Sequence, residues 1–326
     1  MMLRVTRRHT YYLVLALAVA NISTASILVR LANNEGVHGF TVALWRLILS
    51  STITWLLLVV TGFSLPKLLS NPRDLALMSI SGLSLALHFM LWMHSLAHLN
   101  VAASVTIVDS YPALLAIMGR FLLREVYSIP QYLGSFIAFL GILGLSIESY
   151  EGELAPPGGN PLYGVILALG GMVTVSIYFV IGRLLRVKYS TLEYTAVVYT
   201  TGSLASLVLT AISGVEVVVL NPTAWVILVL VALIPMLGGH TLINFVLGKL
   251  TLLASTVPVL GEPVGATILA YIILGEPITG GTLAFMAITL SGIALVLLWE
   301  RGEVKRYNRQ AIGSRGGDDR EGEADS

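Results

Sequence analysis

The stretch LASTVPVLGEPVGATILAYIILGEPIT, residues 253–279, decides the fold. It is apolar along most of its length and ends at Gly275-Glu276-Pro277. The segment 151 residues earlier, AASVTIVDSYPALLAIMGRFLLREVYS at 102–128, aligns with it without a gap. Ala254 and Ser255 fall on Ala103 and Ser104, Pro263 on Pro112, and Glu276 on Glu125. A single offset kept over both segments predicts two copies of one unit.

Composition places these copies in a membrane. Of the 326 residues, 56% are hydrophobic and only 11% are charged, whereas about 25% are charged in an ordinary soluble domain. Apolar runs long enough to cross a bilayer recur along the chain, which indicates an all-α integral membrane protein with ten transmembrane helices. A net charge of +1 gives no reason to expect nucleic acid as a partner, and a chain without cysteine has no thiolate ligand or nucleophile.

The expected spans divide into two sets of five. They are 11–30, 40–61, 75–96, 101–122, 131–148, 161–181, 193–213, 223–247, 252–274 and 279–299. The predicted domains are therefore a cytoplasmic N-terminus at 1–10, a first repeat at 11–150, a second repeat at 161–299 and a disordered cytoplasmic tail at 300–326. Cleavage of the first span as a signal peptide is the less favoured alternative, because that span is longer and more polar than a signal core.

The positions of lysine and arginine predict the orientation. With the N-terminus in the cytoplasm, all of the 19 cationic residues except Arg30 and Arg46 lie on the cytoplasmic side. The connection EGELAPPGGN at 151–160 is acidic and faces outward. We therefore expect a multi-pass protein of the cell membrane (plasma or inner membrane) with both termini in the cytoplasm.

Five spans per copy is an odd number, so the second copy must cross the membrane in the opposite direction. Inverted repeats of this kind build secondary transporters that hold their substrate near the middle of the membrane and open alternately to its two sides. The repeat thus predicts a carrier, which needs a small-molecule substrate and a lipid bilayer but no cofactor.

The ends of the two halves resemble the EamA-type repeat of the drug/metabolite transporter superfamily. The shared features are a helix start rich in Ala and Ser, a proline within the helix, a Gly-Glu-Pro-type turn and a final helix that contains glycine. The first half departs at the turn, with Arg124-Glu125-Val126 in place of Gly275-Glu276-Pro277. The resemblance covers residues 11–299 and implies export of amino acids, related metabolites or drugs. It also implies an arginine in the second span, where Arg46 stands.

Charged residues inside spans are costly and mark candidate functional sites. Asp109 lies about eight residues into span four, and Glu262 lies about ten residues into span nine. Arg46 lies near the outer part of span two. One carboxylate could carry a proton or bind a substrate amine, and Arg46 could bind a substrate carboxylate. The structural alternative is a fixed pair between Arg46 and one of the carboxylates, or a Glu262 that hydrogen-bonds backbone groups freed by Pro258 and Pro263.

Three prolines, Pro112, Pro258 and Pro263, interrupt spans four and nine, and we expect hinges or static kinks there. The remaining candidates are polar or aromatic side chains expected within spans, which could line a substrate cavity: Asn21, His88, Trp92, Tyr111, Tyr178 and Asn244.

The predicted function is therefore a secondary transporter that exports amino acids, related metabolites or drugs by alternating access, with the proton as the candidate coupling ion. An exchanger of sugar phosphates or nucleotide sugars is the first alternative, although Arg46 alone offers little charge for phosphate. A second alternative is a membrane metalloenzyme built on His94 and His98, which lie four residues apart in span three. Core or interfacial histidines are the favoured interpretation, so we expect neither a metal site nor an enzyme. A passive channel is the third alternative.

Overall fold

The computed structural model describes residues 2–64, 68, 70–99, 101–148, 158–274 and 278–300. Apart from short turns and connections, these residues form helices, with no strand among them. The helices are α1 (Met2–Ile22), α2 (Ala25–Asn34), α3 (Gly39–Thr61), α5 (Pro72–Ser95), α6 (Val101–Val108), α7 (Tyr111–Leu122), α8 (Ile129–Glu148), α9 (Pro161–Leu185), α10 (Thr191–Ile212), α11 (Pro222–Val231), the π-helix η1 (Ala232–Thr241), α12 (Leu242–Leu247), α13 (Leu252–Thr256), the 3₁₀-helix η2 (Val257–Gly261), α14 (Glu262–Leu274) and α15 (Gly280–Leu298).

Nine stretches within the described residues are long and apolar enough to cross a membrane. The pair α6–α7 supplies the tenth span, and its two short helices fall below the length of a continuous span because they are separated by a turn. The predicted fold of ten transmembrane helices in two inverted five-helix repeats is therefore confirmed. Many large apolar side chains remain exposed on the outside of the bundle, among them Val60, Leu133 and Phe136, as expected where lipid replaces water.

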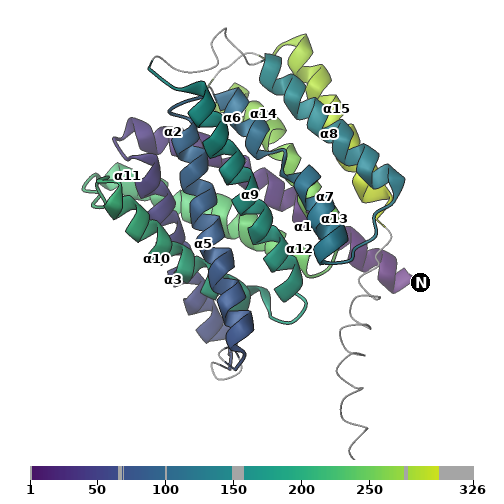
Figure 1. Ribbon diagram of the computed structural model, residues 1–326, viewed down its shortest axis with the longest axis horizontal. Helices are drawn as coiled ribbons and strands as arrows, with labels where there is room; N and C mark the ends of the chain where they lie inside the picture. Colours follow the sequence, from purple (N-terminus) through teal and green to yellow (C-terminus); the bar gives the residue numbers. More distant parts are fainter. Residues whose placement is uncertain are drawn as a thin grey trace, which may run out of the picture.

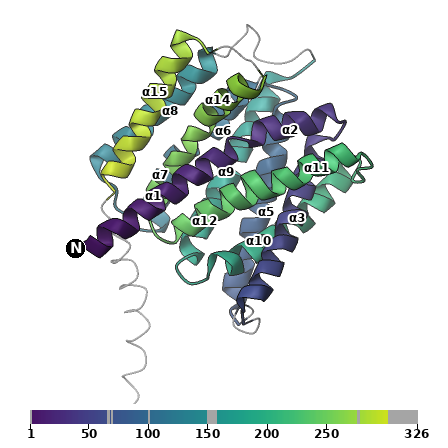
Figure 2. The same ribbon diagram turned by 180° about the vertical axis from the view of Figure 1, so that it is seen from behind.

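Helices of the two repeats are interleaved (Figure 1). The fifth span of each repeat packs against the other, α8 along α15, at one edge of the bundle in both views (Figures 1 and 2). The second spans pack in the same way, α3 along α10, while α5 packs along α9 and α1 along η1. Fifth spans thus pair with each other, as do second spans, and the third span of each repeat pairs with the first span of the other. This reciprocal pairing is the arrangement expected of two copies related by a two-fold axis in the membrane plane.

Four of the spans expected to be continuous are broken. Span one turns at Ser23-Thr24, and span four turns at Asp109-Ser110. Span eight changes from α- to π-helix around Pro235, and span nine contains a 3₁₀ segment around Pro258. Broken helices occur within membranes only where neighbouring groups satisfy the freed backbone. These breaks therefore indicate the part of the bundle in which to look for a functional site.

Asparagine and proline start three of the spans. The side chains of Asn71, Asn160 and Asn221 each accept a hydrogen bond from a backbone N–H in the first turn, and each is followed by proline. This is the N-cap and first-turn proline pattern. A full capping box, Ser190 with Glu193, starts α10 and was not anticipated.

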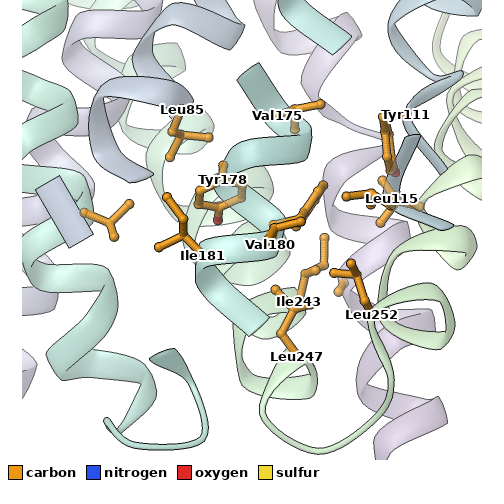
Figure 3. Close-up of a cluster of buried hydrophobic side chains, with 14 of the residues drawn as sticks. Leu85, Tyr111, Leu115, Val175, Tyr178, Val180, Ile181, Ile243, Leu247 and Leu252 are labelled. Carbon is orange, nitrogen blue, oxygen red and sulfur yellow. The ribbon is translucent and has the colours of Figure 1, made fainter. Parts of the chain in front are cut away.

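The two ends of the bundle differ in packing. We call the end of the bundle at which α3, α7, α9 and α12 finish the inner end, after the predicted orientation, and the opposite end the outer end. Every residue from Leu252 to Gly261 is buried, and the inner half of α9 is nearly as closely packed. From Glu262 to Ala270, by contrast, only Val264 is buried. Figure 3 shows part of the inner packing. The described structure is thus closed at its inner end.

The ends of the chain are covered only in part. Helix α1 extends to Met2, so backbone helix continues into the segment expected to precede the first span. Glu300, the first residue of the expected tail, is 1% exposed and accepts a hydrogen bond of 2.9 Å from Gln131 Nε2. The rest of the expected tail, 301–326, and the turn at 275–277 lie outside the described residues.

Candidate functional site

Arg46 lies on α3 and is one of three buried arginines among the described residues, with 2% of its surface exposed. Its guanidinium carbon is 4.3 Å from the ring centroid of Phe89 on α5, a cation–π contact. Its Nε donates to Met236 Sδ on η1 at 3.3 Å, and sulfur is a weak acceptor. Among the described residues no carboxylate lies within ion-pair distance of Arg46. The structure therefore does not contain the fixed pair that was the structural alternative for this arginine.

The two predicted carboxylates come from opposite repeats and reach the same interior. Asp109 lies at the break between α6 and α7, and Glu262 begins α14, directly after the 3₁₀ segment. Both are half-buried. Their charges interact with each other, and the charge of Glu262 also interacts with that of Arg46. The sequence separated these residues by more than 150 positions, and the fold brings them together around one region.

The π-helix of span eight forms one wall of this region. Asn244, one turn beyond it, is fully buried and donates from Nδ2 to the Tyr178 hydroxyl and, at 2.8 Å, to His240 O. Asn244 Oδ1 and His240 Nδ1 are buried and have no hydrogen-bond partner within the part of the chain that the structure describes. The His240 ring contacts that of Phe89 edge-on, with 5.6 Å between centroids. Predicted residues Tyr178 and Asn244 are thereby linked to the Arg46 contact through His240 and Phe89.

Backbone groups of the π-helix are satisfied by side chains from other spans. Asn21 Nδ2, at the end of α1, donates to Gly238 O at 3.0 Å, and Ser50 Oγ on α3 donates to Ala232 O at 3.3 Å. Asn21 thus supports the broken helix, which is the way irregular backbone is tolerated inside a membrane protein. Wide π turns of this kind occur mostly at functional sites.

Two other predicted residues are engaged with backbone. The Tyr111 hydroxyl donates to Thr256 O at 3.2 Å and joins α7 to α13. The two atoms Nδ1 of His88 and O of Gly171 are 3.0 Å apart and join α5 to α9. Trp92 lies farther along α5, half-buried, and packs on a small cluster formed by Leu99, Val108 and Ala168. Of these three residues, His88 lies next to the Arg46 contact because its ring is 5.2 Å from that of Phe89.

The hinge candidates all lie at helix breaks. Pro112 is the second residue of α7, and Pro263 is the second residue of α14. Pro258 lies within the 3₁₀ segment. The first two positions are equivalent in the repeat, and each follows a candidate carboxylate within three residues. Whether these breaks move stays a prediction.

The histidines of span three do not gather a metal-ligand set within the part of the chain that the structure describes. The His94 and His98 rings lie 5.3 Å apart, and His98 Nδ1 accepts a hydrogen bond from Asn160 N at 3.3 Å. Both pack on Tyr163. The pair belongs to an aromatic cluster at the outer end, which gives no support to the metalloenzyme alternative.

Sequence reasoning missed Phe89 and Met236, which hold Arg46. It also missed Pro235, although a proline in the middle of a long apolar run was the available signal for a distorted span eight. Apolar residues at 223–247 show no period that separates a π- from an α-helix. Phe89 and Met236 have chemistry shared by many core positions, and only the fold shows that they surround an arginine.

A buried arginine and two carboxylates enclosed by two inverted five-span repeats define a membrane transporter of small molecules. The chain belongs to the EamA-like transporter family, whose family model matches residues 9–147 and 162–298. It is 24% identical over 268 residues to "Uncharacterized transporter YdfC" of Bacillus subtilis (strain 168), covering 81% of this chain and 84% of that protein. A solved structure titled "Crystal structure of protein" has the same fold, with a TM-score of 0.76, 18% identity and coverage of 90% of this chain and 98% of that one.

Family membership places this protein among transporters rather than enzymes. It is a multi-pass membrane protein, and its substrate is a small molecule.

Proposed function

We propose that this protein is a secondary transporter that exports amino acids or related small metabolites and drugs by alternating access. The proposal includes insertion in the cell membrane with both termini in the cytoplasm. The observation that supports it most is the charge inside the bundle, where Arg46 has no carboxylate at bonding distance among the described residues and Asp109 and Glu262 are half-buried.

Charges held apart in a low-dielectric interior are unfavourable unless something compensates for them. A substrate with a carboxylate and an amine would do so, with its carboxylate at Arg46 and its amine at Asp109 or Glu262. The aromatic and aliphatic walls, including Phe89, suit an apolar side chain on that substrate. A hydrophobic cation would use only the two carboxylates.

Proton coupling is part of the proposal. A carboxylate inside a span can carry a proton or bind a substrate amine, but it cannot do both at once. A substrate amine arriving at this pair would displace the proton, and the proton would return when the substrate leaves. Exchange of this kind is antiport. Among the described residues, Arg46 on α3 and Tyr111 on α7 interact electrostatically with this pair, and the Tyr111 hydroxyl donates to Thr256 O.

The phosphate alternative has weaker support. Apart from Arg46, the buried cations of the described region are Arg183 and Arg186 at the inner end. Arg183 pairs with Glu125, and Arg186 donates to Asn244 O, Tyr189 O and Thr191 Oγ1. These guanidiniums are occupied by protein groups, so one arginine is left for a doubly charged phosphate.

The experiment is saturable uptake of labelled amino acids by the purified protein in liposomes. Uptake that saturates and is lost in Arg46→Met would support the proposal. Flux that rises linearly with concentration would favour the channel alternative. Saturable uptake of a sugar phosphate, with none of amino acids or organic cations, would favour the exchanger.

A further inference from the structure

A buried ion pair joins the two repeats at the inner end. Arg183 Nε, at the end of α9, lies 2.7 Å from Glu125 Oε1, in the connection after α7. Their side chains are only 4% and 8% exposed. Although both residues lie near the cytoplasmic boundary, neither has the exposure of an ordinary loop charge. A buried charge loses its hydration, and several ion-pair or hydrogen-bond partners are needed to offset that loss.

An unusual backbone conformation aims Glu125 into the bundle. Arg124 has φ 54°, and among the described residues it is the one non-glycine with a positive φ. The N–H of Glu125 then bonds back to Gly119 O, six residues earlier, at 3.0 Å, which closes the turn at the end of α7. Glycine avoids the steric cost of this conformation, and glycine stands at the aligned position in the second repeat, Gly275.

The second carboxylate oxygen binds two further donors. Glu125 Oε2 accepts a hydrogen bond of 2.9 Å from the Tyr127 hydroxyl and one of 2.8 Å from the N–H of Leu252. Leu252 is the first residue of α13, whose early N–H groups lack partners within the helix. A carboxylate at this point also interacts favourably with the helix dipole. Burial, followed by the charge of Glu125, raises the pKa of Tyr127, so its phenol remains a donor.

This network connects the pieces that would separate if the inner end opened. Arg183 also donates to Leu247 O, at the end of α12, so one carboxylate ties α7 of the first repeat to α9, α12 and α13 of the second. Buried residues including Leu115, Val180 and Leu252 lie in the cluster that closes this end (Figure 3). Gly119 permits the approach, because a Cβ there would lie 2.0 Å from the Tyr127 oxygen.

We propose that Glu125 is the residue that holds the inner end closed and sets the balance between the two access states. This inference rests on the proposed alternating access. Glu125 does not touch the candidate substrate site; it is a positioning residue that acts through α13, which continues through η2 to Glu262. Loss of its charge removes the ion pair with Arg183 while an amide can retain one acceptor for Leu252. The inner end should then open more often.

Site-directed labelling can test this directly, because the chain has no cysteine. The inner reporter is Val180→Cys, at a position 7% exposed in the closed cluster. The outer reporter is Ser110→Cys, at the half-buried break beside Asp109. Each is combined with Glu125→Gln, and the rate of maleimide labelling is measured on purified protein in nanodiscs. Asp74→Asn is the matched control, since it removes another ion pair at the inner end. Asp74, on α5, pairs with Lys188, in the connection that follows α9, and α5 and α9 pack together.

The expected result is labelling of Val180→Cys about tenfold faster in Glu125→Gln, together with slower labelling of Ser110→Cys. Faster labelling at both reporters would mean general loosening and would overturn the proposal, as would unchanged rates. If the control Asp74→Asn also gave faster labelling of Val180→Cys and slower labelling of Ser110→Cys, the proposal would be overturned too. The labelling needs no substrate, so the two proposals fail in different experiments. Failure of the transport proposal would appear in the uptake assays, whereas failure of the proposal for Glu125 would appear in the labelling rates.

Discussion

The guanidinium of Arg46 lies over the ring of Phe89, with 4.3 Å between its central carbon and the ring centroid. A planar guanidinium can stack in this way and still present donors to a carboxylate, which a lysine ammonium cannot do. We therefore predict that Arg46→Lys lowers substrate affinity by about tenfold or more, since a desolvated cation–π contact contributes about 2 kcal/mol. Concentration dependence of uptake in liposomes gives the affinity. Wild-type affinity in Arg46→Lys would show that charge alone is needed.

Asp109 is predicted to carry the coupling proton. In liposomes with a pH difference, Asp109→Asn should abolish the part of substrate accumulation that depends on that difference. Exchange of substrate for substrate, which needs no net proton movement, should remain measurable. Glu262→Gln is the companion variant, because Glu262 is the other member of the interacting pair. Full pH-driven accumulation by Asp109→Asn would rule out this role.

Glycine at position 82 permits close packing of α5 on α10. A Cβ there would lie 1.9 Å from Thr201 Oγ1 and 2.3 Å from Val198 O. Because backbone cannot move aside easily, Gly82→Ala should destabilise the protein by about 1–3 kcal/mol. Gly280→Ala is the control, since nothing lies within 4 Å of a Cβ at that helix start. Thermal unfolding of the purified proteins should separate the two, and equal midpoints would contradict the described packing.

At Arg124 we predict the opposite of the Gly82→Ala result, because here a glycine should be tolerated. Its left-handed conformation costs a non-glycine residue about 1–2 kcal/mol, whereas glycine carries an entropic cost of about 0.5–1 kcal/mol. Arg124→Gly should therefore be neutral or slightly stabilising. Val126→Gly, at an exposed neighbour without a positive φ, should be destabilising. A lower midpoint for Arg124→Gly than for Val126→Gly would contradict the conformation described at this turn.

Much of the fold could be predicted because it depends on repeated local signals. Apolar runs, the asparagine–proline starts at Asn71, Asn160 and Asn221, and the offset between Glu125 and Glu276 each act through nearby residues. Breaks in the spans were less visible. The π-helix carbonyls of Gly238 and Ala232, on either side of Pro235, accept hydrogen bonds from Asn21 and Ser50. Both donors lie far away in sequence, so the stability of a π-helix there depends on tertiary contacts.

The site was predicted in part for the same reason. Charge inside an apolar run is conspicuous, which singled out Arg46, Asp109 and Glu262. The arrangement of these three residues relative to one another could not be predicted, because the depth of a residue along its own helix does not determine which other helix it contacts. The inner network was missed because Glu125 and Arg183 read as ordinary loop charges, and only packing shows that they are buried.

Solute counterflow tests the central claim, that this protein is a carrier with a saturable exchange site, most directly. Liposomes containing the purified protein are preloaded with a pool of unlabelled amino acids, and a trace of labelled substrate is added outside. The account predicts transient accumulation of label above equilibrium, which is absent in Arg46→Met and from empty liposomes. Separate pools of organic cations and phosphorylated sugars identify the class if amino acids fail. Equilibration without overshoot from every pool would contradict the account.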